Sequence, residues 1–419
     1  MRLYRAEALF DGDGRLLRDA GVVVDDGGTV QEVGPIDSIR TGVSERHDVQ
    51  VLMPGVVNAH THLTDAEIER PVPGGDGLNA WVRRLLKRRD GRPDPEDTIE
   101  QGEPRRANGP SQSVALDAFA EVLRRMRQSG TVASGEVCNG IATHEPILQS
   151  GMRTRFIQEL LAFRSERAAP ALEAAVAIET TARRNDRVLP TIGIHAPYSV
   201  SPELAGMILE HNTKRRRLTF VHLTEDPAER ELYINGDGPW KEYLKELGAW
   251  DESWRAPGVA PIEHYDRLGL LGPSLAAVHL ADATDDEIAL VATRGVRVIL
   301  SPTSNLHIGN RLPPLEAIVA RGIPFALGTD GRGSNPSIDV FDEAGLLAER
   351  FESLDGMLLI QALTANGAAM LGFGELGRIA PGMRPGLVAI EVASLDGSDG
   401  DVARRVIIEP ISRGAHPGG

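Results

Sequence analysis

The chain has 419 residues, of which 41% are hydrophobic and 25% are charged, as expected for one large globular domain with room for a smaller one. Its formal net charge of -15 argues against nucleic acid or an anionic membrane as a partner, because both require a basic surface. The single cysteine, Cys138, excludes an internal disulfide framework. Because the sequence shows neither a signal peptide nor an apolar run of roughly 20 residues, it predicts a cytoplasmic protein.

Short strands are predicted at both ends of the chain. Residues 21–24, a turn at residues 25–28 and residues 29–33 carry the signal of a β-hairpin. Near the C-terminus, residues 386–390 and 402–408 are predicted to be strands, with a turn at Pro381 before them. The expected result is a small β-sandwich domain built from both chain ends, residues 1–53 plus 377–419.

Between these ends, apolar strand-like segments alternate with amphipathic helices. Residues 114–128, for example, carry apolar side chains at helical spacing and are followed by Gly130 as a stop signal. Eight strand–helix units predict an α/β fold, a distorted (β/α)8 TIM barrel over residues 54–376, with a doubly wound sheet as the alternative. The expected strands are residues 51–57, 131–133, 155–157, 191–194, 218–221, 275–278, 296–300 and 324–327.

Two segments interrupt this alternation. Residues 91–113 are rich in proline, glycine and charge and are predicted to form a mobile loop after the first strand. Residues 236–261 carry Trp240, Trp250 and Trp254, three of the four tryptophans of the chain. They are expected to form either a lid over a pocket or a satellite hydrophobic core.

Potential metal ligands recur where the predicted strands end. His60 and His62 follow the first strand, and residues i and i+2 of a strand point to one face, so both imidazoles can reach one ion. Each histidine alone is compatible with a hydrogen-bonded structural role. Barrel enzymes carry their chemistry at the C-terminal ends of strands, however, so the coincidence indicates an active site. The further candidates at strand ends are His195, His222, Glu225, His279 and Asp330, with Glu136 and Glu159 as weaker ones.

These segments resemble the amidohydrolase superfamily, in its single-metal deaminase and chlorohydrolase branch. The resemblance covers nearly the whole chain. It is carried by His-x-His after Pro54-Gly55, His-Ala-Pro-Tyr at 195–198, His-Leu-Thr-Glu at 222–225, Val-His-Leu at 278–280, Ser-Pro-Thr-Ser-Asn at 301–305 and Gly-Thr-Asp at 328–330.

The resemblance implies one metal ion per chain. His60, His62, His222 and Asp330 would bind it, and this donor set suits Zn²⁺, with Fe²⁺ also compatible. Metal-bound hydroxide would then attack a ring carbon that bears an amino group, with release of ammonia.

The same resemblance implies roles for the other candidates. Glu225 would carry a proton to the ring nitrogen and contact the substrate, and His279 would orient the water. Asp330 would also pass a proton to the leaving amine. His195 would hold a polar group of the substrate, such as a ribose hydroxyl. Trp81 is a candidate for stacking on the substrate, and a packed helix face explains it as well.

Lysine usage separates one-metal from two-metal relatives. The two-metal relatives require a carboxylated lysine at the end of the fourth strand. The four lysines of this chain all lie outside the expected strands, so a single-metal site is favoured. They are Lys87, Lys214, Lys241 and Lys245.

Within the branch, residues 60–63 and 77–83 resemble enzymes that deaminate 6-aminodeoxyfutalosine on a route to menaquinone. The predicted function is therefore hydrolytic deamination of an adenine-type nucleoside. The alternatives are deamination of S-adenosylhomocysteine, methylthioadenosine, guanine or cytosine, imidazolonepropionase-like ring opening, a two-metal amidase or dipeptidase, and a non-catalytic binding protein. The expected partner is a small molecule, without nucleic acid or membrane, and a homodimer is left open as the assembly.

Overall fold

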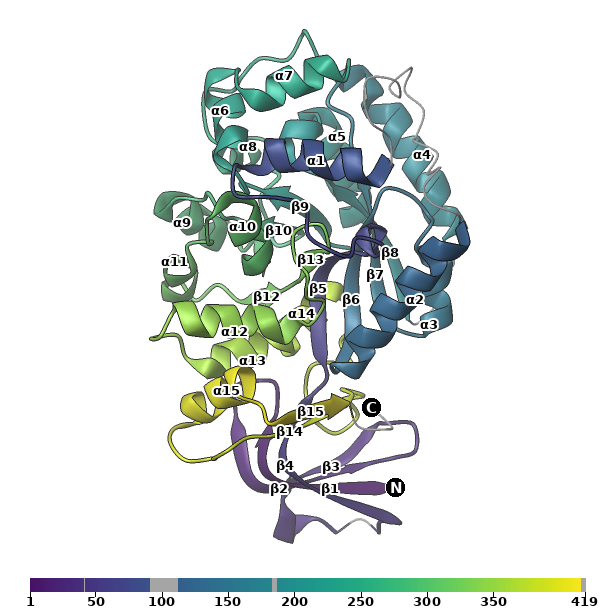
Figure 1. Ribbon diagram of the computed structural model, residues 1–419, viewed down its shortest axis with the longest axis vertical. Coiled ribbons are helices and arrows are strands. Elements are labelled where there is room, and N and C mark those ends of the chain that lie inside the picture. The colour runs from purple at the N-terminus through teal and green to yellow at the C-terminus, as the bar shows by residue number, and fades with distance from the viewer. Residues whose placement is uncertain (41, 91–111, 183–186, 416–419) are drawn as a thin grey trace.

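The structure is a computed structural model that describes residues 1–40, 42–90, 112–182 and 187–415 (Figure 1). The loop predicted over residues 91–113 falls outside the described residues up to residue 111, and helix α2 begins at Gln112. No helix in the described ranges combines the length and apolar character that crossing a bilayer requires.

The central part is a closed barrel, which confirms the predicted fold class. Its eighth strand is interrupted at Gly328 and Thr329. The first half, β12, pairs with β11, and the second half, β13, pairs with β5, so the sheet returns to its first strand and the doubly wound alternative is wrong. The barrel strands, in sheet order, are β12 (Phe325–Leu327), β11 (Arg297–Leu300), β10 (Leu275–His279), β9 (Thr219–Leu223), β8 (Val188–Ile194), β7 (Arg153–Leu160), β6 (Thr131–Cys138), β5 (Val56–His62) and β13 (Asp330–Gly331).

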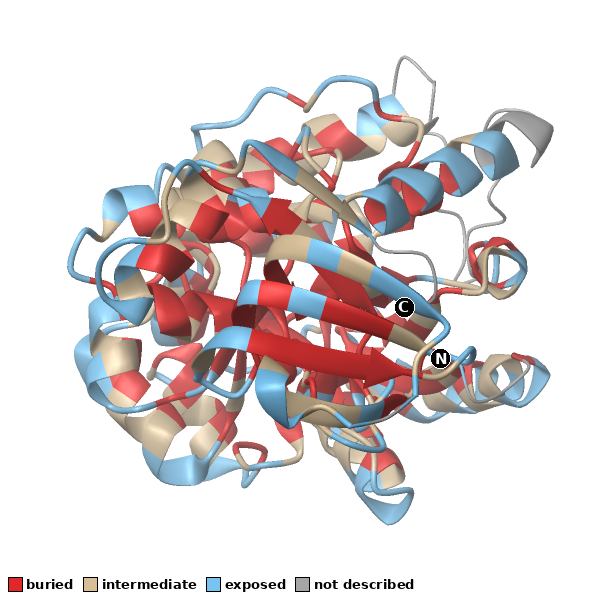
Figure 2. Ribbon diagram, turned by 90° about the horizontal axis from the view of Figure 1, so that it is seen from below, coloured by how far each residue is buried: buried red, intermediate tan, exposed pale blue. Residues whose placement is uncertain are grey.

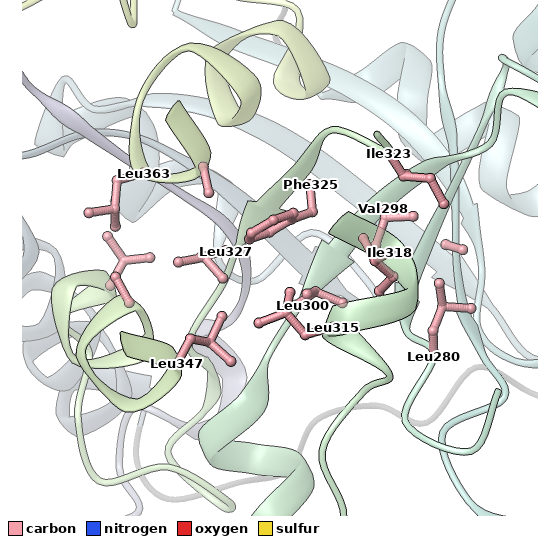
Figure 3. Close-up of a cluster of buried hydrophobic side chains, with 14 of the residues drawn as sticks. Leu280, Val298, Leu300, Leu315, Ile318, Ile323, Phe325, Leu327, Leu347 and Leu363 are labelled. Atoms are coloured by element: carbon pink, nitrogen blue, oxygen red, sulfur yellow. The ribbon is translucent and has the colours of Figure 1, made fainter. Parts of the chain in front are cut away.

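Side chains alternate between the two faces of the barrel wall. Val298 and Leu300 point outward and pack with the surrounding helices, in the cluster of Figure 3, whereas Ile299 between them belongs to a separate cluster. That second cluster fills the barrel interior and includes Leu371 of helix α14, which contacts β5, β6 and β12. Apolar side chains therefore fill the N-terminal half of the barrel, so the polar residues of a site can gather only at the C-terminal ends of the strands.

Helices surround the barrel, and α1 crosses its end opposite the terminal sheet (Figure 1). The helices are α1 (Leu78–Asp90), α2 (Gln112–Gln128), α3 (His144–Ser150), α4 (Ala168–Thr181), α5 (Pro202–Lys214), α6 (Pro227–Asn235), α7 (Pro239–Glu246), α8 (Pro261–Arg267), α9 (Asp285–Arg294), α10 (Pro302–Gly309), α11 (Leu315–Ala320), α12 (Val340–Arg350), α13 (Gly356–Leu363), α14 (Ala365–Leu371) and α15 (Asp399–Ile408), with short 3-10 turns such as η2 (Leu63–Asp65) between some of them.

Both chain ends contribute to a second, six-stranded sheet, seen from below in Figure 2. The predicted hairpin is present as the antiparallel pair β2 and β3. The strands, in sheet order, are β15 (Ser412–Ala415), β14 (Leu387–Glu391), β4 (Glu45–Pro54), β1 (Arg2–Phe10), β2 (Leu16–Val24) and β3 (Val30–Pro35).

The strand predicted over residues 402–408 is wrong, because this segment is helix α15. Ser398 and Asp401 form a capping box that satisfies the first backbone N–H groups of the helix. Val402, Ala403 and Val406 are buried at helical spacing. The β-branched residues that suggested a strand serve here as the apolar face of a helix, and α15 packs on α12 and α13.

The expected first strand over residues 51–57 is in fact two strands. Strand β4 ends at Pro54 in the terminal sheet, and β5 begins at Val56 in the barrel. Gly55 turns the chain between them, where a Cβ atom would lie 2.3 Å from Cγ1 of Val132. Because β4 leads directly into β5, the C-terminal ends of the barrel strands face away from the terminal sheet.

Candidate active site

The structure brings the four proposed metal ligands together at the C-terminal ends of β5 and β9 and at the start of β13. Ring nitrogens of His60, His62 and His222 all lie within 4.8 Å of one another. Asp330 Oδ1 lies 3.5 Å from Nε2 of both His60 and His62. Two ligands of one tetrahedral Zn²⁺ ion are separated by about 3.3 Å, so small side-chain adjustments bring this set onto a single cation.

The surroundings of His60 indicate whether a cation fits between the proposed ligands. Its side chain is 1% exposed, and neither ring nitrogen makes a hydrogen bond to any described residue. A buried polar atom without a partner costs about 1–3 kcal/mol, and a metal bond removes that cost. The residues present therefore fit a divalent ion bound through imidazole nitrogen.

The protonation states of the proposed ligands also suit metal binding. Burial lowers the pKa of His62 well below its ordinary value and that of His222 to about 4, so both imidazoles are neutral at physiological pH. Burial by itself would raise the pKa of Asp330, but His60 and His62 outweigh it and hold that pKa well below the usual range. Neutral imidazoles and an ionised carboxylate are the forms that bind metals.

Hydrogen bonds from surrounding residues orient the ligands. His222 Nδ1 lies 2.7 Å from the carbonyl oxygen of His195, which directs the other ring nitrogen toward the cluster. Ser304 Oγ of α10 donates to Asp330 Oδ2 at 2.6 Å, which leaves Oδ1 facing His60 and His62. Ser304 is a functional neighbour that sequence reasoning did not assign, and its place in the 301–305 motif was the available signal.

Glu225 and His279 lie next to the cluster. Glu225 Oε2 is 3.5 Å from His279 Nε2, and the Glu225 side chain is only 7% exposed. Burial raises the pKa of Glu225 well above its ordinary value, and the charge of Asp330 adds to this effect. His279 Nδ1 is 3.1 Å from the side-chain nitrogen of Asn305, which sets the ring orientation. A neutral carboxylic acid beside a metal-type cluster is able to donate a proton.

Backbone strain concentrates at these strand ends. Thr224, His279, Leu280 and Asp330 all have positive φ angles, of 51°, 78°, 54° and 60°. Such conformations in non-glycine residues cost about 1–3 kcal/mol each and persist where the surroundings enforce them. They turn the chain so that successive side chains enter the site.

Helix α1 and the loop before it close the mouth of the barrel. Leu78 N donates to Asp226 Oδ2 at 3.0 Å, and His307 Nε2 lies 2.6 Å from the carbonyl oxygen of Val72. At the other end of α1, Arg89 Nε donates to the buried Asp65 Oδ1 at 2.7 Å. These contacts attach the covering segment to the strand-end loops.

The tryptophan-rich segment forms a satellite core. Trp240 and Trp250 are buried, and Trp240 stacks on Tyr198 with ring centroids 3.7 Å apart. Trp81 of α1 is 7% exposed and belongs to the same cluster, with Trp254 packed at its edge. Of the two expectations for this segment, the structure therefore shows the core. Substrate contact by Trp81 stays a prediction.

A β-bulge shapes the His-x-His strand. Asn58 pairs with Ser134 and Thr61 with Glu136, so two residues of β5 oppose the single residue Gly135 of β6. A Cβ atom at Gly135 would lie 2.3 Å from the carbonyl oxygen of Ala59, so only glycine fits there. The bulge re-aims the end of β5 toward the cluster.

Glu136 holds the strand beyond the bulge. It does not face the pocket. Its carboxylate accepts hydrogen bonds from Thr61 Oγ1 at 3.0 Å and from Leu63 N at 3.0 and 3.2 Å, and these two residues flank His62. Burial raises the pKa of Glu136 to about 8. Glu136 thus positions His62 indirectly, by holding the two residues on either side of it.

Substituting Glu136 by alanine is expected to weaken metal binding about 10–100-fold, because it removes the hydrogen bonds that hold the residues on either side of His62. Competition with a chromogenic chelator measures this change, and Glu121→Ala on the exposed face of α2 is the control. Unchanged metal affinity in a folded Glu136→Ala protein would contradict the positioning role.

The closed barrel and the histidine–carboxylate cluster at its strand ends place this chain among the barrel enzymes. The model of the Amidohydrolase family matches residues 51–414, and the chain belongs to this family.

Two curated relatives are similar over most of their length. An aminodeoxyfutalosine deaminase of Deinococcus radiodurans is 28% identical, over 88% of this chain and 86% of that protein. A 5-methylthioadenosine/S-adenosylhomocysteine deaminase of Teredinibacter turnerae is 26% identical, over 83% of this chain and 73% of that protein.

Two solved structures share the fold. The Helicobacter pylori aminofutalosine deaminase in complex with methylthio-coformycin has a TM-score of 0.80 at 19% identity, over 100% of this chain and 99% of that one. An adenosine deaminase from Xanthomonas campestris with bound zinc has a TM-score of 0.73 at 24% identity, over 98% of this chain and 89% of that one.

Proposed function

We propose that this protein is a metal-dependent deaminase of adenine-type nucleosides, with 6-aminodeoxyfutalosine as the leading substrate. The observation that carries the proposal is the convergence of His60, His62, His222 and Asp330 beside the buried acid Glu225. The named activities of the relatives support it, since both act on an adenine nucleoside.

One divalent cation, for which Zn²⁺ suits the donors, would be held by the three imidazoles and the carboxylate. When bound there, such an ion lowers the pKa of a water molecule and supplies hydroxide at neutral pH.

Side chains of the protein then carry out the proton transfers of the reaction. Burial raises the pKa of Glu225 and so favours its protonated form, which gives its proton to the ring nitrogen next to the amino-bearing carbon and makes that carbon more electrophilic. Asp330 Oδ1 accepts the proton of the attacking water, and His279 hydrogen-bonds the oxygen as it adds. As the tetrahedral adduct collapses, Asp330 gives its proton to the leaving amine and the adduct hydroxyl returns a proton to Glu225, so water and the aminopurine become ammonia and the oxopurine.

Ammonia release from a substrate panel tests this proposal. The panel contains 6-aminodeoxyfutalosine, 5′-deoxyadenosine, methylthioadenosine, S-adenosylhomocysteine, guanine, cytosine, imidazolonepropionate and an N-acyl dipeptide. We expect turnover of adenine nucleosides, loss of turnover after chelation and its return with Zn²⁺. Hydrolysis of the dipeptide without deamination of any nucleoside would overturn the proposal.

A further inference from the structure

Glu159 is a buried acid beside the cluster that the proposed mechanism does not use. It lies at the C-terminal end of β7, is 5% exposed, and pairs in the barrel sheet with Gly193 of β8. Its Oε1 accepts a hydrogen bond from Asn139 Nδ2 at 2.9 Å. Its Oε2 accepts no hydrogen bond from any residue that the structure describes. Glu159 is therefore a fixed carboxyl group with one oxygen left for a partner.

The unpaired oxygen lies beside two histidines of the site, His195 and His222. Glu159 Oε2 is 3.7 Å from His222 Nδ1, and a carboxyl oxygen of Glu159 lies within 4.8 Å of ring nitrogens of both His195 and His222. At 3.7 Å the contact with His222 is too long for a hydrogen bond, and that nitrogen is already 2.7 Å from the His195 carbonyl oxygen. The cluster itself thus leaves Glu159 Oε2 without a donor.

His195 provides a second hydrogen-bonding group, a ring nitrogen close to the Glu159 carboxyl group. Its Nδ1 lies 2.5 Å from Ser199 Oγ, so the ring is oriented, and Nε2 makes no hydrogen bond to a residue that the structure describes. A carboxyl oxygen and an imidazole nitrogen side by side complement hydroxyl groups, which donate and accept at once. Either protonation state of Glu159 pairs with a hydroxyl for the same reason.

We propose that Glu159, together with His195, recognises a sugar hydroxyl of the substrate and so determines specificity for the ribo-nucleoside over a deoxy analogue. The inference rests on the proposed function and refines its substrate class. In the free protein this buried oxygen has no donor among the described residues, and a substrate hydroxyl supplies one, so a nucleoside that lacks the hydroxyl loses a hydrogen bond. A site built for a hydroxyl discriminates strongly against the analogue that lacks it.

The experiment compares adenosine with 2′-deoxyadenosine and 3′-deoxyadenosine as probes, by kcat/KM for ammonia release. We expect the native protein to prefer adenosine over at least one deoxy analogue by about tenfold or more. Glu159→Leu, which keeps the volume and removes the hydrogen bond, should lower this ratio at least about tenfold, mainly by loss of adenosine turnover. Glu159→Gln should retain part of the preference.

Metal content and circular dichroism are measured for every variant, and Glu166→Leu, the same change at an exposed position near α4, is the control. If Glu159 only supported His222, turnover of all three nucleosides would fall in parallel and metal would be lost, which would overturn the inference. If Glu159→Leu does not fold, an adenosine preference in Glu159→Gln equal to the native value overturns it as well. Failure of the native protein to deaminate any nucleoside would instead overturn the proposed function.

Discussion

Glu225→Gln is expected to lower turnover by about 10²–10⁴-fold while the protein keeps its metal. Glutamine preserves the size of the side chain but cannot give a proton to the ring nitrogen, and general acid catalysis contributes about 10²–10⁴-fold. The side chain is 7% exposed and lies 3.5 Å from His279 rather than among the four proposed ligands, so the cluster should stay intact. We expect kcat to fall by about that factor, with substrate affinity and metal content unchanged.

The control for this variant is Glu231→Gln, the same change at an exposed position of α6. It should leave kcat unaltered. Retained activity in Glu225→Gln would remove Glu225 from the proton-transfer step. Loss of metal from it would assign Glu225 to the metal site.

His62→Asn is expected to remove the metal and, with it, activity. A structural Zn²⁺ site is worth about 10–16 kcal/mol over four ligands, so one ligand contributes about 3 kcal/mol, a hundredfold or more in affinity. We expect metal analysis after dialysis to find about one ion per native chain and little in the variant.

His211→Asn is the matched control, because His211 lies 3.1 Å from Glu179 on the outer helices and has no contact with the cluster. It should retain both metal and activity. Two ions per native chain, or full metal retention in His62→Asn, would contradict the single-ion site.

Much of this architecture follows from local patterns. The apolar segments that predicted eight strands all contain or overlap barrel strands, and the helix expected over residues 114–128 lies within α2. The potential ligands could be chosen from the sequence because they directly follow such segments. In a barrel of parallel strands, all the C-terminal ends meet at one face, so position in the sequence determines position in the fold.

Other features depended on contacts that no local pattern contains. The apolar run at residues 51–57 predicted one strand, but the close approach of Val132 to Gly55 divides it between two sheets. Residues 402–408 have strand-type composition, yet the capping box and packing on α12 and α13 make them helical. Burial against a partner outweighs intrinsic propensity in both cases.

The sequence alone was sufficient for the barrel, the second sheet and the set of strand-end histidines and acids, because backbone periodicity and strand direction are local properties. Only the tertiary structure showed that Glu136 holds the His62 strand, that Ser304 orients Asp330 and that Glu159 keeps an oxygen free beside His195. Each of these assignments depends on which side chain from a distant segment lies within hydrogen-bond distance. That is decided when the whole chain packs.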